Sequence, residues 1–168
     1  MSRGVLVAGI GNIFQTDDAF GVEVARRLTT RTLPPRARVE DFGIRGVHLA
    51  YELLEGYDGL VLIDAIPLGE PAGTLAVIAP EVRPESITND DMAPVVDAHT
   101  MNPQVVLNTL ARLGGSVEKI FIVGCQPANL QEGMGLTAAV AAAVDEAVEM
   151  CCQLVSDIAE PVGKGSST

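Results

Sequence analysis

The sequence predicts a three-layer α/β/α fold around a mostly parallel five-stranded sheet with one antiparallel strand. Two observations lead to this prediction. Short apolar runs without alternation are typical of parallel strands covered on both faces, and residues 60–63 are the clearest such run. Between the runs, apolar residues recur every three or four positions, as on amphipathic helices. The order β-α-β-α-β-β-α-β-α therefore indicates one sheet with helices on both faces.

The first half of the chain supplies three predicted strands and two predicted helices. The strands cover residues 5–8, 37–42 and 60–63, and a Leu-Pro-Pro loop or glycine turns separate them from their neighbours. Phe20, Val24 and Leu28 form one apolar face of the first helix. For the second helix we expect the apolar face to consist of Val47, Tyr51 and Leu54.

The second half begins with a strand at residues 74–79, which a short Gly/Pro loop connects to the preceding strand, so we expect antiparallel pairing. Residues 80–98 form a long acidic loop, and loops of this length are usually functional or mobile. Pro103 is expected to begin a helix that ends before Gly114. A strand at 119–125 and a helix at 137–157 complete a single domain over residues 1–159, followed by a disordered tail at 160–168.

Composition excludes several classes of function. The net charge of −11 argues against nucleic acid or an anionic membrane as a partner. No stretch is long and apolar enough to span a bilayer, and the apolar run near the start is too short for a signal peptide. The three cysteines form no C-x-x-C pair and fit reduced thiols. We therefore expect a cytoplasmic protein of ordinary globular composition.

The segment from residue 5 to residue 24 carries the strongest functional signal. A strand, a Gly-x-Gly-Asn turn and a helix usually bind phosphate, because a helix N-terminus attracts anions. Here the chain places Asp17 and Asp18 at that position, so the turn is predicted to hold a cation or a proton. The structural alternative is that Thr16 caps the helix and that the two acids favour its dipole.

Two further residues are predicted to meet Asp18 at the carboxyl edge of the sheet. Asp64 directly follows the buried run 60–63, and His99 lies between the acidic loop and the next helix. One imidazole and two carboxylates suit an open site for a divalent transition metal. Alternatively, Asp64 accepts N–H bonds from a neighbouring turn. The other histidine, His48, is expected to be solvated beside Glu52 and Glu55.

An ordered set of motifs over residues 5–150 resembles the hydrogenase maturation endopeptidases. The matching motifs are Gly9-x-Gly11-Asn12, Asp17-Asp18-Ala19-Phe20-Gly21, Asp41-x-Gly43-x-x-Gly46, Ile63-Asp64-Ala65 and His99. The resemblance implies a phosphorylase/hydrolase-like fold and an endopeptidase that removes the C-terminal extension of the nickel–iron hydrogenase large-subunit precursor.

The resemblance also implies the roles of individual residues. Asp18, Asp64 and His99 would be the catalytic residues and would bind the nickel that the precursor already carries. The resemblance therefore implies nickel as part of the substrate and no organic cofactor. Substrate contacts are expected near the strand ends, at Asn12, Asp41, Gly43 and Arg45. Either an aspartate or the nickel could activate the attacking water.

Three other functions remain open from the sequence. Gly9-x-Gly11 opens a dinucleotide-binding pattern, although Phe14 occupies the third glycine position and the two acids would repel phosphate. A cysteine hydrolase could use Cys125 with His99, although a free cysteine is more often simply buried. A non-catalytic module that binds nickel and the precursor would need the same three ligands.

Overall fold

The computed structural model describes residues 4–80 and 103–159. In this part of the chain, five strands form one sheet in the spatial order β2-β1-β3-β5-β4. The strands are β1 (Val5–Ile10), β2 (Ala37–Gly43), β3 (Gly59–Ala65), β4 (Leu75–Ile78) and β5 (Lys119–Cys125). All neighbours pair in parallel except β4, which pairs antiparallel with β5. The predicted sheet, including its one antiparallel strand, is confirmed.

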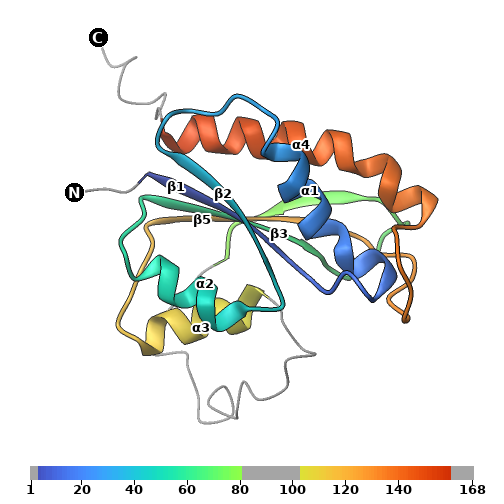
Figure 1. The fold of residues 1–168 in the computed structure, drawn as a ribbon, viewed down its shortest axis with the longest axis horizontal. Helices are drawn as coiled ribbons and strands as arrows, with labels where there is room; N and C mark the ends of the chain where they lie inside the picture. The colour runs from blue at the N-terminus through green and yellow to red at the C-terminus, as the bar shows by residue number, and fades with distance from the viewer. Residues whose placement is uncertain (1–3, 81–102, 160–168) are drawn as a thin grey trace.

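Helices cover both faces of this sheet (Figure 1). One face carries the short 3-10 helix η1 (Thr16–Ala19), α1 (Phe20–Leu28) and α4 (Ala138–Ala159). The opposite face carries α2 (Gly46–Leu53) and α3 (Pro103–Arg112), which contact each other. The three layers follow from the right-handed crossovers that connect parallel strands.

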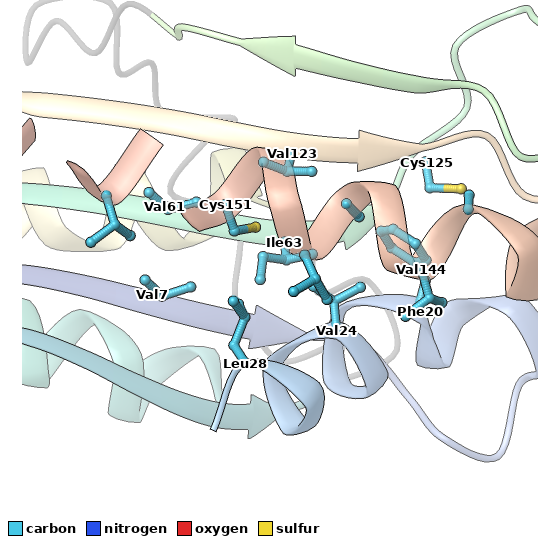
Figure 2. Close-up of a cluster of buried hydrophobic side chains, with 14 of the residues drawn as sticks. Val7, Phe20, Val24, Leu28, Val61, Ile63, Val123, Cys125, Val144 and Cys151 are labelled. Carbon is cyan, nitrogen blue, oxygen red and sulfur yellow. The ribbon is translucent and has the colours of Figure 1, made fainter. Parts of the chain in front are cut away.

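Two apolar clusters fill the space between the layers. The cluster below α1 and α4 contains Phe20, Val24 and Leu28, as the sequence predicts, and Figure 2 shows them gathered beneath α4. Four valines of α4 also belong to it: Val140, Val144, Val148 and Val155. The second cluster joins β1 and β3 to α2 and α3. The near-continuous burial of β1 and β3 explains why neither strand alternates between apolar and polar residues.

The predicted apolar face of α2 is wrong. Val47, Tyr51 and Leu54 are exposed, with exposed fractions of 45%, 55% and 40%. The buried face instead consists of Leu49, Ala50 and Leu53, which pack in the second cluster. Both sets have helical spacing, so periodicity alone does not distinguish them. Only the direction from which the sheet approaches decides which set is buried.

Three sequence predictions lie outside the described residues. They are most of the acidic loop at 80–98, His99 and the tail at 160–168. Over the residues that the structure does describe, no helix combines the length and the apolar character that crossing a membrane requires.

The parallel strands bring four candidate site residues to one edge of the sheet, namely Asp41, Gly43, Asp64 and Cys125. The registers of β1 with β2 and β3 align Gly9 with Asp41 and with Ile63. A register shift after Gly9 makes Ile10 pair with Gly43, so the β2 strand gains one residue at its end. The edge formed by Ile10, Gly43, Ala65 and Cys125 is the place where such sheets bind ligands.

Candidate functional site

Glycines allow the turn after β1 to lie directly against the sheet. A Cβ atom at Gly21 would stand 2.1 Å from the carbonyl oxygen of Ile63, and one at Gly11 would stand 1.9 Å from that of Asp18. Gly11 also has a φ of +141°, which disfavours any other residue. The glycines of the motif therefore bring α1 and η1 into backbone contact with β1 and β3.

Asp18 lies half-buried on η1 and faces the turn. Its Oδ2 atom accepts a hydrogen bond of 2.8 Å from the backbone N–H of Asn12. Burial raises the pKa of Asp18, and the Asn12 N–H opposes this effect only in part. The carboxylate is thus held in place by the turn, while its pKa moves in the direction expected of a desolvated acid.

Asp64 is buried at the end of β3, with an exposed fraction of 2%. Its Oδ1 atom has no hydrogen-bond partner among the described residues. Burial raises the pKa of Asp64 well above its ordinary value, and the charge of Asp18 raises it further. The alternative in which backbone N–H groups satisfy this carboxylate holds only in part, because a bond from the Ala65 N–H lowers the pKa of Asp64 whereas Oδ1 has no partner among the described residues. A buried, unpartnered carboxylate oxygen beside a second acid suits a cation or a proton.

Asp17 has a different environment, although it is next to Asp18 in the chain. It is fully buried and accepts hydrogen bonds from the backbone N–H groups of Ala128, Asn129 and Thr137, and from the Thr137 hydroxyl. Burial alone would raise the pKa of Asp17, but the bonds from these residues outweigh it and lower the pKa. Asp17 therefore joins η1 to the β5–α4 loop, which comprises residues 126–137, and does not face the candidate cation site.

Thr16 does not cap the helix. Gln15 is the residue that precedes η1, and it makes no side-chain capping bond. The Thr16 hydroxyl instead donates to the carbonyl oxygen of Gln131 at 2.6 Å. The capping alternative from the sequence is wrong for Thr16, because a distant loop competes successfully for its hydroxyl.

The residues predicted to contact substrate lie together. Asn12, Asp41, Gly43 and Arg45 all line one pocket of about 320 Å³ at the carboxyl ends of β1 and β2. The Arg45 guanidinium donates to the carbonyl oxygens of Asp41 and Phe42, at 2.9 Å and 3.2 Å. These bonds hold the Arg45 side chain against the end of β2.

Sequence reasoning missed the apolar wall of this pocket. Ile13, Phe14 and Ile44 also line it, and Phe14 and Ile44 have exposed fractions of 61% and 46%. The available signal was that Phe14 and Ile44 are bulky apolar residues in turns that are otherwise polar or glycine-rich. The pocket can therefore contact both polar and apolar groups of a bound chain.

The predicted third ligand, His99, lies outside the described residues. Within the described ranges, 4–80 and 103–159, no three His, Cys, Asp or Glu side chains form a group that could hold a metal ion. The described residues thus supply a pair of carboxylates, Asp18 and Asp64. His48 is exposed on α2, as the sequence predicts.

Cys125 ends β5 and is completely buried. Burial raises the pKa of its thiol to about 11, and the charge of Asp17 adds to this effect. A thiol with a raised pKa and no exposed surface is a poor nucleophile. The structure therefore disfavours the cysteine-hydrolase alternative and places Cys125 at the end of β5, in the apolar cluster that packs against α1 and α4 (Figure 2).

Comparisons with known proteins agree with this fold and these motifs. The family model described as hydrogenase maturation protease matches residues 22–154. Hydrogenase 2 maturation protease of Escherichia coli is 33% identical over 147 residues, which cover 86% of each chain. The hydrogenase expression/formation protein HupD of Rhodobacter capsulatus is 33% identical over 86% of this chain and 67% of its own length.

Solved structures show the same similarity. The hydrogenase-maturating endopeptidase HybD from E. coli superposes with a TM-score of 0.72 at 28% identity, covering 92% of this chain and 93% of its own. The hydrogenase 2 maturation peptidase from a thaumarchaeon superposes with a TM-score of 0.70 at 28% identity, covering 91% and 98%. The match with the family model spans most of the chain, and the chain belongs to the hydrogenase maturation protease family.

Proposed function

We propose that this protein is the endopeptidase that removes the C-terminal extension of a nickel–iron hydrogenase large-subunit precursor after nickel insertion. The family match and the E. coli hydrogenase 2 maturation protease support the class of reaction. The observation that carries the proposal is the carboxylate pair. Asp64 holds a buried oxygen that has no hydrogen-bond partner among the described residues, and the charge of Asp18 acts on it at the edge where this type of sheet binds ligands.

In this proposal, Asp18, Asp64 and His99 bind the nickel carried by the precursor. Carboxylate oxygens and an imidazole nitrogen form a donor set that divalent transition metals accept. Three ligands leave coordination positions free for groups of the substrate. The nickel is thus part of the substrate, and recognition of it would allow cleavage only after metal insertion.

The pocket beside the carboxylates is proposed to bind the precursor chain near the cleavage site. Asn12 and Gly43 line the pocket together with Phe14 and Ile44, which offer apolar contacts. Asp41 and Arg45 add charges of both signs to the lining. The attacking water would be activated by a carboxylate of the pair or by the substrate's nickel.

We place the reaction in the cytoplasm. Cys125, Cys151 and Cys152 are all free thiols in the structure, as is usual in a reducing compartment.

Mass spectrometry of the purified precursor, before and after incubation with the protein, tests the proposal. We expect the nickel-loaded precursor to lose a C-terminal segment and the metal-free precursor to keep its mass. If the protein bound the nickel-loaded precursor without any loss of mass, it would be a non-catalytic binding module. Equal cleavage of both forms would exclude recognition of nickel while leaving the protease activity intact.

A further inference from the structure

Thr16 adopts a backbone conformation that β-branched residues avoid. Its φ is +52°, and it is the one non-glycine residue with a positive φ in the described part of the chain. Its N–H donates to the Gly133 carbonyl oxygen at 2.9 Å, and its hydroxyl donates to that of Gln131. An unfavourable φ persists only where surrounding bonds impose it. The β5–α4 loop therefore imposes the shape of the chain at the first residue of η1.

Asp17 makes the next connection to the same loop. Its N–H donates to the Asn129 carbonyl oxygen at 3.0 Å, and its carboxylate accepts bonds from Ala128, Asn129 and Thr137. The Thr137 bonds span 120 positions of sequence and reach the residue directly before α4. The loop thus bonds to both the backbone and the side chain of Asp17 in η1.

Asp17 and Asp18 face different partners from one short helix. Asp17 bonds to the β5–α4 loop, whereas Asp18 accepts a bond from Asn12 and acts electrostatically on Asp64. A single 3-10 turn has few internal hydrogen bonds to define its orientation. The rotation of η1, and with it the position of Asp18, therefore depends on contacts from outside the helix.

We propose that Asp17 is a positioning residue, whose buried hydrogen bonds to the β5–α4 loop hold η1 so that Asp18 keeps its place at the turn, where it accepts the hydrogen bond from the Asn12 N–H. This inference rests on the proposed function to the extent that Asp18 acts in processing. The core does not depend on it, because the two apolar clusters and the sheet register are built from other residues. Loss of the Asp17 bonds should consequently displace Asp18 in a protein that still folds.

The backbone N–H of Asn12 offers a readout of this position that needs no activity, since it donates to Asp18. Amide hydrogen exchange and chemical shift would be followed by NMR in Asp17→Asn and in the milder Thr137→Val. We expect Asn12 exchange to become about tenfold faster in both variants. Thr137→Ser, which keeps the hydroxyl, should restore the wild-type rate. Thr109→Val is the matched control, because it removes a hydroxyl bond to Val105 within α3.

Cleavage kinetics on the nickel-loaded precursor provide the second readout. Thr137→Val should lower kcat by about tenfold to a hundredfold with a smaller change in KM, because a misplaced catalytic group slows the reaction while Thr137 is not among the residues that line the pocket. Thr137→Ser should recover kcat, and Thr109→Val should match the wild type.

The two readouts separate this inference from the proposed function. If the wild-type protein cleaves no precursor, the proposed function fails, while the Asn12 response still tests the role of Asp17. An unchanged Asn12 signal in folded Asp17→Asn and Thr137→Val proteins overturns the inference, whatever the activity. A Thr109→Val variant with a kcat as low as that of Thr137→Val also overturns the inference, because the loss of kcat would then reflect general stability and not the position of Asp18.

Discussion

The carboxylates of Asp18 and Asp64 interact electrostatically at the end of β3, where the charge of Asp18 adds to the effect of burial and raises the pKa of Asp64. The two residues are far apart in sequence and belong to different elements. Close packing at Gly21, whose α-carbon faces the backbone of Ile63, brings the elements together. The protein thus holds a buried acid in an unfavourable environment, as is typical of functional sites.

Asp64→Asn should remove activity and raise the free energy of unfolding. An acid whose pKa is raised by folding destabilises the folded state above that raised pKa, and this effect disappears below its ordinary value of 3.8. The variant should therefore melt at a higher temperature than the wild type near pH 7, and the difference should shrink as the pH falls. Calorimetry across this pH range measures it. The exposed Asp58 is the control, because Asp58→Asn should change stability little.

Gly21→Ala should disrupt the packing of α1 against β3. The added Cβ atom would stand 2.1 Å from the Ile63 carbonyl oxygen, a backbone atom that cannot turn aside. We expect a loss of about 1–3 kcal/mol in the free energy of unfolding and a loss of processing, because Asp18 would shift away from Asp64. Urea denaturation and a processing assay measure the two effects.

The comparison variant for Gly21 is Gly56→Ala. Gly56 has a φ of +93° and no atom within 4 Å of its Cβ position, so alanine there is strained without a clash. It should lower stability yet leave processing intact when assayed well below the melting temperature. Loss of processing in both variants would mean that activity depends on general stability and not on the packing of α1 against β3.

Phe14→Ala should weaken binding of the precursor. Phe14 lines the pocket and is 61% exposed, so its removal leaves no large cavity in the core. If it contacts the precursor equally before and during cleavage, KM should rise several-fold while kcat stays unchanged. Steady-state kinetics measure this, with Leu113→Ala as the control for an exposed apolar residue elsewhere. A lower kcat at unchanged KM would instead assign Phe14 to the chemical step.

His99→Ala should abolish processing, and His48→Ala should not. The family resemblance implies that His99 is the third nickel ligand, whereas His48 is exposed on α2. The chain contains two histidines, so the pair forms its own matched comparison. The processing assay and far-UV circular dichroism should show an inactive but folded His99→Ala protein. Full processing by that variant would falsify the three-ligand hypothesis.

Much of the architecture follows from local pattern. The runs at residues 5–8, 60–63 and 119–125 are apolar because parallel strands are covered on both sides, and each one became a strand of the sheet. Asp64 could be placed at the edge of the sheet, because it directly follows such a run. The pairing of β4 with β5 is antiparallel, as the short loop before β4 led us to expect.

The tertiary structure decided what the neighbouring acids do. Asp17 and Asp18 are adjacent and chemically identical, yet one bonds to the β5–α4 loop, whereas the other accepts a bond from Asn12 and its charge acts on Asp64. The partners of Asp17 lie more than 100 positions away in the chain, and no local pattern encodes such a distance. The apolar face of α2 was misassigned for a similar reason, since two faces had helical spacing and only the sheet selected one. Sequence determines which residues can make contacts, and packing determines which contacts are made.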